Sequence, residues 1–515
     1  MRDNLTVPQV GQPKVRALLA LVTNVALGTI AAMGQAPLGL WAVTPVALAL
    51  LLWRLARAAR LRTVFLHALA AGLGWFALSL VWIVEPFLVE PEIYGWMAPF
   101  ALTLMALGGG LFWAFPAALG WWIGAGWRRR LVGIAAALVL SDWLRGWIFT
   151  GFPWALIGHV WIGTPVAQAA AWIGAPGLTA LTLLLAALPA LIWWASDRRG
   201  LGFAPGALLS VLLLGAVWAG GMARLAQPLP EDTGVRLRLV QPNADQRLKW
   251  DPDWAAEFYR RLLDLSSAPG ARDVVIWPES AVNFLLDDAA PVLTQMAGAA
   301  DAPLILGIQR RDGLRFYNSL AVLGQDGAVS QVYDKFHLVP FGEYIPWGNV
   351  MAQFGIHAFA AQEGFGYSAG SGPAVMNLPD LPSMQPLICY EAIFAQHLRG
   401  LDQRPGWLLQ ITNDAWFGQF SGPYQHLAQA RLRAVQAGLP VIRVANTGVS
   451  AVIDARGGLR QTLGLNEAGF IDAVLPGAMG GTFWIRWGDG PLVALAALLL
   501  VGAGRRRKDR TAPRR

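Results

Sequence analysis

Long apolar runs, separated by short basic or polar stretches, dominate the first half of the chain. A helix that crosses a bilayer needs roughly 20 mostly apolar residues. By this criterion the sequence predicts about eight spans, of which the second and the last are short. The runs begin near Ala17, Leu38, Val64, Met97, Leu131, Val166, Phe203 and Pro491. The pattern therefore predicts a polytopic α-helical membrane protein.

From Val235 onward the pattern changes to short strand-like runs that alternate with helical segments near 253–267, 289–299 and 421–437. The strand-like runs are residues 236–243, 273–280, 303–310, 317–323, 331–336, 386–391, 407–414, 440–448 and 450–454. Alternating strands and helices predict a layered α/β domain with functional residues at strand ends. We therefore expect three regions along the chain. They are a helical membrane region (1–227), an α/β domain (228–486) and a last membrane helix with a basic tail (487–515).

The distribution of charge supports this division. The chain is 55% hydrophobic and 14% charged, whereas a soluble protein carries about 25% charged residues. Residues 1–227 contain six carboxylates, but residues 228–486 contain 24, together with 19 Lys and Arg. The net charge of +8 does not indicate nucleic-acid binding, because the basic surplus lies in the loops of the helical region and in the tail. Membrane lipids with anionic headgroups are the natural partners of such loops.

The basic clusters predict one orientation in the membrane. With the N-terminus in the cytoplasm, every cluster falls on the cytoplasmic side, as the positive-inside rule requires. The clusters are residues 54–62, 128–130, 197–199 and 505–507. Both termini are then cytoplasmic, and the α/β domain lies outside, in the periplasm of a Gram-negative cell. The first apolar run could instead be a cleaved signal peptide, but it lacks a small-residue cleavage site followed by a soluble stretch, so we expect a retained helix.

Three strand ends in the α/β domain carry candidate catalytic side chains: Glu279, Lys335 and Cys389, the only cysteine. A nucleophilic thiol needs a base and a cation for the oxyanion. A carboxylate in a partly apolar site is expected to have a raised pKa that suits it to accept a thiol proton, and an ammonium lowers the thiol pKa. A single cysteine at a strand end is more often a small packing residue. It is the combination of the three that indicates thiol chemistry.

Metal and cofactor chemistry is not predicted. The six histidines are scattered without the spacing of a zinc-binding motif, and no glycine-rich phosphate loop is present. A single cysteine in an oxidising compartment cannot form an internal disulfide, which leaves its thiol free.

The motifs around these residues resemble the carbon–nitrogen hydrolase (nitrilase-like) superfamily, which has a Glu–Lys–Cys triad on an αββα sandwich. WPES at Glu279, DKFHLVPFGEYIP at Lys335 and ICYE at Cys389 match its three motif regions in order. Together with the flanking helices, LRGWIFTGFPW (residues 144–154) and NDAWFG (residues 413–418), they resemble the apolipoprotein N-acyltransferase family over nearly the whole chain.

The resemblance implies a role for each matched residue. Glu279 would be the general base, Lys335 the oxyanion stabiliser and Cys389 the nucleophile. Supporting positions fall on Glu343, Tyr390 and Glu391, and substrate-contacting aromatic positions fall on Trp250 and Trp416. Glu343 could orient Lys335, and Trp416 could equally be a packing residue.

The reaction implied by the resemblance is a ping-pong acyl transfer in the inner membrane. Cys389 would take an acyl group from a phospholipid, phosphatidylethanolamine in the family, and pass it to the N-terminal diacylglyceryl-cysteine of an apolipoprotein. Two alternatives remain at this stage. A membrane-tethered amidase would share the triad but let water attack the thioester, and a transporter with an outer accessory domain would need ionisable residues within its spans. Only Asp142 and Arg145 lie near a span, where they can pair with each other.

The long segment from Val339 to Gly372 lies between Lys335 and Cys389 and contains several large apolar residues. A loop of this length inside a compact domain is often functional. One hypothesis is a movable flap at the membrane interface that admits lipid, and the other is a short amphipathic helix packed on the domain.

Overall fold

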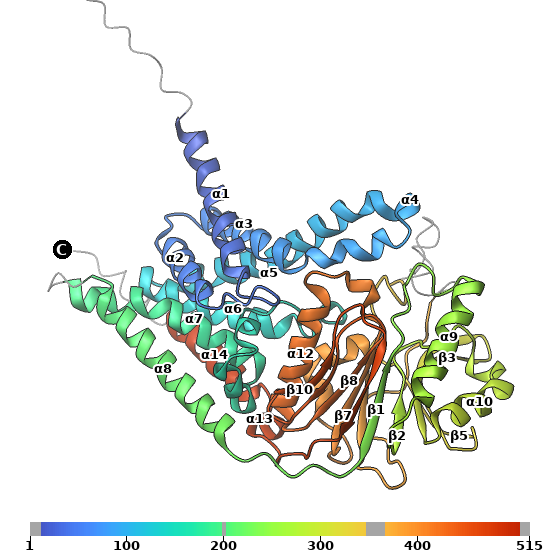
Figure 1. Ribbon diagram of the computed structural model, residues 1–515. Helices are drawn as coiled ribbons and strands as arrows, with labels where there is room; N and C mark the ends of the chain where they lie inside the picture. The colour runs from blue at the N-terminus through green and yellow to red at the C-terminus, as the bar shows by residue number, and fades with distance from the viewer. Residues whose placement is uncertain (1–11, 198–201, 347–365, 505–515) are drawn as a thin grey trace, which may run out of the picture.

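The computed structural model describes residues 12–197, 202–346 and 366–504. Eight long helices lie at the eight places where the apolar runs predict them (Figure 1). They are α1 (Gln12–Ala32), α2 (Val43–Arg57), α3 (Leu61–Ser79), α5 (Ala98–Ile123), α6 (Trp127–Leu144), α7 (Ala170–Asp197), α8 (Ala204–Ala226) and α14 (Gly490–Gly504). Within the described ranges, five segments are long and apolar enough to cross a membrane, so the count of about eight spans stays a prediction. These five comprise α1, α3, α7 with the turn before it, α8, and the run Pro91–Ile123 that ends with α5.

The helices pack through small residues and one buried ion pair. A side chain on Gly120 of α5 would collide with the backbone of Gly133 on α6, so these two helices approach backbone to backbone. The predicted pair at the end of α6 is confirmed, because Arg145 Nη2 lies 3.2 Å from Asp142 Oδ1. Arg145 also donates to the carbonyl oxygen of Trp154 at 3.0 Å, which holds the loop that follows α6.

The α/β domain contains two mixed sheets. The first has the order β11-β1-β2-β3-β4-β5 and the second the order β10-β9-β8-β7-β6. The strands of the first are β1 (Arg236–Gln241), β2 (Val274–Ile276), β3 (Leu304–Asp312), β4 (Arg315–Leu323), β5 (Val329–Asp334) and β11 (Gly469–Val474). Those of the second are β6 (Met384–Ile388), β7 (Trp407–Thr412), β8 (Val441–Ala445), β9 (Ser450–Ile453) and β10 (Leu459–Leu463). Strands β1 to β3 are parallel to one another, as are β6 to β8.

The two sheets and their covering helices form the four-layered sandwich that the resemblance implies. Buried residues of both sheets share one core, which includes Leu239, Ile276, Ile388 and Ile411. Helices α9 (Pro252–Ser267) and α10 (Ala290–Ala300) cover the outer face of the first sheet. Helix α12 (Gly422–Ala437) covers the second sheet and lies between it and the membrane helices (Figure 1).

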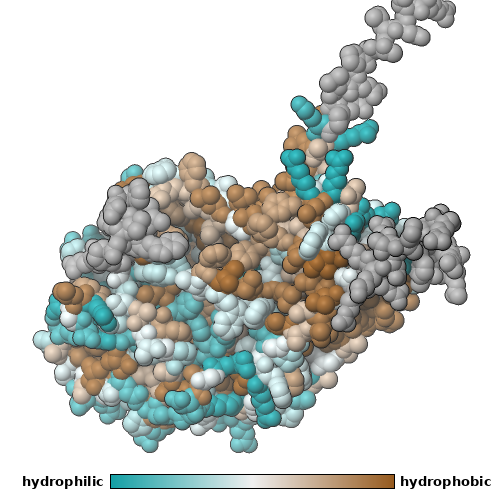
Figure 2. All heavy atoms as spheres, turned by 180° about the vertical axis from the view of Figure 1, so that it is seen from behind, coloured by the Kyte–Doolittle hydropathy of each residue, from teal (hydrophilic) through white to brown (hydrophobic). Residues whose placement is uncertain are grey.

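The two parts of the chain differ in the polarity of their surfaces. Apolar side chains cover the helical part, whereas hydrophilic ones are concentrated over the sandwich (Figure 2). Among the exposed apolar residues of the long helices are Phe100, Phe115, Val211 and Leu498. A membrane is the environment in which such a surface is stable.

Candidate active site

Glu279 lies at the end of β2, on a turn pinned to the neighbouring strand. Gly307 of β3 donates its N–H to Pro278 and accepts from Ala281, and a Cβ at Gly307 would collide with the backbone of Glu279. Only glycine allows this close approach. The carboxylate is buried and accepts hydrogen bonds from the Asn318 side chain and from the backbone N–H of Asn413, both at 2.8 Å.

Lys335 follows β5 and is almost completely buried, with 1% of its surface exposed. Its ammonium lies 2.9 Å from Glu343 Oε1 and 3.3 Å from Glu279 Oε1. Burial alone would lower the pKa of Lys335, but Glu343 and Glu279 outweigh it and raise the pKa well above its usual value. The side chain therefore stays a cation with two carboxylate partners.

Asn318 of β4 joins the two carboxylates. Its side-chain amide donates to Glu279 Oε1 at 2.8 Å and to Glu343 Oε1 at 3.0 Å. Glu343 also accepts the backbone N–H of Val339 at 2.8 Å. The sequence does not single out Asn318, and the one signal that it carries is a polar residue close to the apolar residues 320–323 of the same strand.

Cys389 is the first residue after β6 and lies on a strained turn. Its φ is +50°, a left-handed conformation that non-glycine residues adopt at a cost of about 1–3 kcal/mol and mostly at functional sites. The thiol is buried. Burial and the charge of Glu279 raise its pKa well above the usual value against the opposing effect of Lys335, so the resting residue is a neutral thiol.

The ionisation of Glu279 differs from the expectation. Burial would raise its pKa, but Lys335 and the hydrogen bonds from Asn318, Asn413 and Cys389 together lower it. The raised pKa expected for Glu279 is therefore wrong, because four polar partners of the carboxylate together outweigh the effect of burial. A carboxylate beside a neutral thiol and an ammonium can still accept the thiol proton as attack begins.

Glu391 connects the cysteine turn to the lysine loop. Its carboxylate accepts the backbone N–H groups of Ile388 at 2.7 Å, Phe336 at 2.8 Å and His337 at 3.3 Å, and the hydroxyl of Tyr333 at 3.1 Å. Burial is the main cause that raises its pKa to about 7. Glu391 thus supports the site through the backbone on both sides of it and does not contact the reacting atoms.

The backbone of Cys389 rests on a buried network from the second sheet and α12. Its carbonyl oxygen lies 3.1 Å from His426 Nε2, and His426 Nδ1 lies 3.0 Å from Asp414 Oδ1. Arg443 forms an ion pair with the other oxygen of Asp414. Arg443 and His426, together with hydrogen bonds, overcome burial and lower the pKa of Asp414 to about 2. The network fixes the position of the Cys389 backbone.

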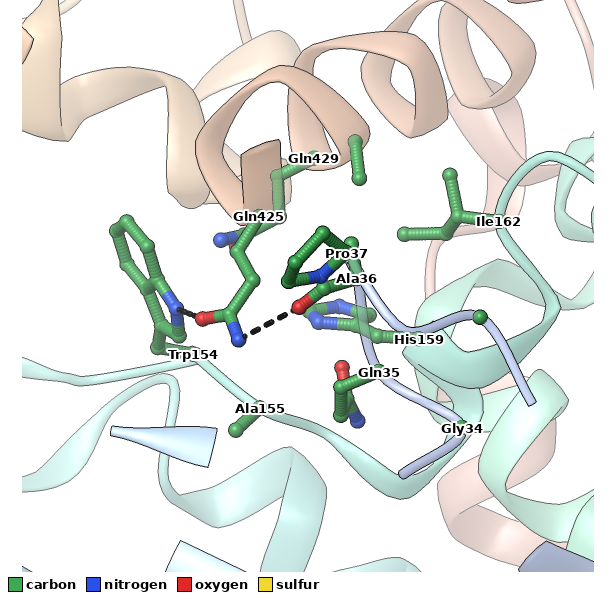
Figure 3. Close-up of a pocket in the computed structure, with 12 residues that line it drawn as sticks. Gly34, Gln35, Ala36, Pro37, Trp154, Ala155, His159, Ile162, Gln425 and Gln429 are labelled. Carbon is green, nitrogen blue, oxygen red and sulfur yellow. Dashed lines mark hydrogen bonds between the residues drawn. The ribbon is translucent and has the colours of Figure 1, made fainter. Parts of the chain in front are cut away.

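Contacts from the helical part reach this network. The loop 148–154 lies against the turn of Cys389, where Tyr390 donates to the carbonyl oxygen of Gly151. Trp154 donates to Gln425 of α12 at 2.6 Å (Figure 3), and Gln425 directly precedes His426 in the chain. Gln425 in turn donates to the carbonyl oxygen of Ala36 at 3.0 Å. A cavity of about 160 Å³ between α12 and the helical part is lined by Ala36, Trp154 and Gln425, among other residues.

The remaining candidates differ in how closely they are placed. Trp250 and Trp416 are half-buried, and in the described part of the chain neither makes a hydrogen bond with the triad. Lys249, beside Trp250, is a residue that the sequence interpretation missed. It is buried, and burial lowers its pKa to about 8 against the opposing charge of Glu279.

Most of the proposed flap, residues 347–365, lies outside the described residues. Among the described residues, no group of three or more His, Cys, Asp or Glu is arranged to hold a metal ion.

Comparisons with known proteins identify relatives of both parts of the chain. Residues 27–188 match the model of the apolipoprotein N-acyltransferase N-terminal domain, and residues 236–480 match that of the carbon–nitrogen hydrolase. The chain is 39% identical to the apolipoprotein N-acyltransferase of Bradyrhizobium diazoefficiens, over 97% of this chain and 96% of that protein. It is 37% identical to that of Rhodopseudomonas palustris, over 94% of each.

Among solved structures, a carbon–nitrogen hydrolase superfamily protein from Xanthomonas campestris is 20% identical, with a TM-score of 0.35 over 50% of this chain and 96% of that one. The full-length relatives, rather than this distant likeness, decide the assignment. The chain therefore belongs to the apolipoprotein N-acyltransferase family.

Proposed function

We propose that this protein transfers a fatty acyl group from a phospholipid to the N-terminal amine of a diacylglyceryl apolipoprotein, through a thioester on Cys389. The observation that carries the proposal is the convergence of Glu279, Lys335 and Cys389 at the boundary with the membrane helices, in a chain of this family. Both substrates are lipids, and moving an acyl chain into water costs about 0.8 kcal/mol per CH₂. A site beside the membrane avoids that cost.

In the first half-reaction Glu279 accepts the proton of the Cys389 thiol while the sulfur attacks the carbonyl carbon of the phospholipid ester. The oxyanion that forms is stabilised by the Lys335 ammonium, which its two carboxylate partners keep charged. The ester C–O bond then breaks, and the leaving oxygen of the lysophospholipid takes the proton from Glu279. The products are a thioester and a free Glu279 carboxylate.

In the second half-reaction the neutral α-amine of the apolipoprotein attacks the thioester carbonyl, and Glu279 accepts a proton from the nitrogen. The C–S bond breaks, and the thiolate regains the proton from Glu279. The net change converts an ester and an amine into an alcohol and an amide, so the enzyme returns to its initial state. We assign phosphatidylethanolamine as the donor.

We place the protein in the bacterial inner membrane, with region 228–486 in the periplasm and both termini in the cytoplasm. The basic clusters support this orientation. Region 1–227 would supply the membrane helices, and 487–515 the last helix and tail. Trp250 and Trp416 are assigned to substrate contact, because they fall at the substrate-contacting positions of the family and both are half-buried.

The test uses the purified protein with a phospholipid that carries a labelled acyl chain and a diacylated lipopeptide. We expect a hydroxylamine-labile acyl label on the parent protein and a gain of one acyl group in peptide mass. Cys389→Ala should show neither while remaining folded. Stable acyl label on Cys389→Ala, or release of free fatty acid without peptide acylation, would contradict the proposal, and the second result would favour the amidase alternative.

A further inference from the structure

A second cavity, of about 270 Å³, lies between the helical part and the sandwich. It is bounded by the loop around Gly163, the end of α8 at Leu225, the outer side of α12 at Arg431, and the turn after β9 at Arg456. None of the residues that line it belongs to the triad or hydrogen-bonds to a triad side chain. The cavity is therefore separate from the acyl-transfer site.

Three guanidinium groups surround this cavity. Arg431 and Arg456 line it, and Arg224 reaches it through a hydrogen bond to Gln168, which is also a lining residue. Among the described residues, none of the three arginines forms an ion pair with a carboxylate. The neighbouring carboxylate, Asp454, instead accepts the backbone N–H groups of Arg456 and Gly458. Asp454 acts electrostatically on Arg224 and Arg431 without forming an ion pair with either, so three guanidinium groups share one nearby carboxylate.

Several donors of these arginines remain available. Arg456 is 3% exposed; its terminal nitrogens bind the carbonyl oxygens of Leu225, Gln227 and Pro228, but its buried Nε has no partner in the described structure. Within the part of the chain that the structure describes, Arg431 uses only its Nε, which donates to the carbonyl oxygen of Gly457 at 2.8 Å. A buried donor without a partner is destabilising, so a ligand with acceptor oxygens would supply the missing hydrogen bond.

The cavity also adjoins the lipid-facing surface. Helix α8 lies along the outer edge of the helical part (Figure 1), with Leu212 and Met222 exposed. Leu225 is 38% exposed and at the same time lines the cavity. From Leu212 to Leu225 the helix rises roughly 20 Å, which exceeds the roughly 15 Å thickness of one hydrocarbon leaflet. An acyl chain that lies along α8 would place its headgroup at the arginines.

We propose that this cavity binds the phosphate group of a phospholipid whose acyl chains lie along α8. Phosphate oxygens are the acceptors that guanidinium groups recognise best, and the bond is stronger where water is partly excluded. The bound lipid would fill the space between α8 and α12 and contact both the helical part and the sandwich. The inference goes beyond acyl transfer and does not depend on it.

The test uses the full-length protein carrying Cys389→Ala, so that no lipid is consumed, purified and stripped of lipid. Native mass spectrometry would measure how many molecules of dioleoyl phosphatidylglycerol are retained, and with what affinity. We expect Arg431→Gln to weaken one binding event by about tenfold, and Arg431→Lys to retain part of it. Arg404→Gln is the matched control, because Arg404 also binds backbone carbonyl oxygens in this domain but lies outside the cavity.

Two further ligands show whether the cavity binds a phospholipid headgroup or free inorganic phosphate. Dioleoylglycerol, which lacks phosphate, should bind the parent and Arg431→Gln proteins equally, and inorganic phosphate should compete only weakly. Competition by inorganic phosphate as strong as that of the phospholipid would overturn the lipid assignment. Equal phosphatidylglycerol counts and affinities in the parent and Arg431→Gln proteins would overturn the site itself, whatever the outcome for acyl transfer.

Discussion

The hydroxyl of Tyr390 donates a hydrogen bond to the carbonyl oxygen of Gly151 at 3.0 Å, although the two residues are 239 positions apart. Tyr390 directly follows Cys389, the proposed nucleophile, and Gly151 belongs to the loop between α6 and α7. The helical part therefore contacts the turn that carries Cys389 directly. Because the strained backbone of Cys389 needs support from its surroundings, this bond links the membrane helices to the position of the thiol.

Tyr390→Phe should slow acyl transfer while leaving the protein folded. The substitution removes one hydrogen bond and leaves a buried carbonyl oxygen unpaired, a loss of about 1 kcal/mol or somewhat more, which corresponds to roughly a fivefold to tenfold decrease in rate. Initial rates of lipopeptide acylation and thermal unfolding would be compared with those of Tyr424→Phe, a tyrosine with an exposed side chain. Equal rates for the two variants would contradict a positioning role.

Asn318→Ala should raise the pKa of Glu279 and reduce acyl transfer by about 10- to 100-fold. In the parent protein the Asn318 amide donates hydrogen bonds to the carboxylates of Glu279 and Glu343, and it contributes to the lowered pKa of Glu279. Without it both carboxylates lose a donor, at a cost of about 1–3 kcal/mol. The rate measured against pH should show its acidic limb displaced to higher pH, and the control Asn377→Ala, at an exposed position, should not. An unmoved acidic limb would argue against this role.

Lys249→Met should stabilise the protein at neutral pH. The folded pKa of Lys249 is about 8, below its unfolded value of 10.5, because the side chain is buried. Between these values the unfolded chain binds more protons, so the free energy of unfolding rises with pH from 8 to 10.5. Below pH 8 the buried ammonium lowers the free energy of unfolding by up to about 3 kcal/mol. Unfolding measured from pH 7 to 10.5 should show a flatter dependence for Lys249→Met, and parallel curves would refute the prediction.

Reporter fusions test the orientation. Fusions after Arg62, Arg130 and Arg199 should report the cytoplasm, and fusions near Glu90 or within 228–486 should report the periplasm, because the basic clusters remain inside. A cytoplasmic signal from the α/β domain would overturn both the compartment and the access of that domain to apolipoproteins.

The sequence by itself determined the positions of the membrane helices and most of the strands. An apolar run near 20 residues long has few stable alternatives to a helix in a bilayer, and a strand end that carries Glu279 or Cys389 is a local pattern. Local sequence patterns also explain where the predicted elements differ from the structure. Helix α2 begins at Val43 rather than near Leu38 because a turn around Gly39 precedes it. Strands β10 and β11 were missed because β10 is mostly exposed and polar and β11 only partly buried.

Only the tertiary structure decided the surroundings of these side chains. Asn318 between two carboxylates, Glu391 between two loops and Tyr390 on Gly151 each depend on residues distant in the chain. The lowered pKa of Glu279 has the same origin, because it results from the balance between burial and its charged and hydrogen-bonding partners. That balance is set by distances of a few ångströms, and motif spacing contains no such distances.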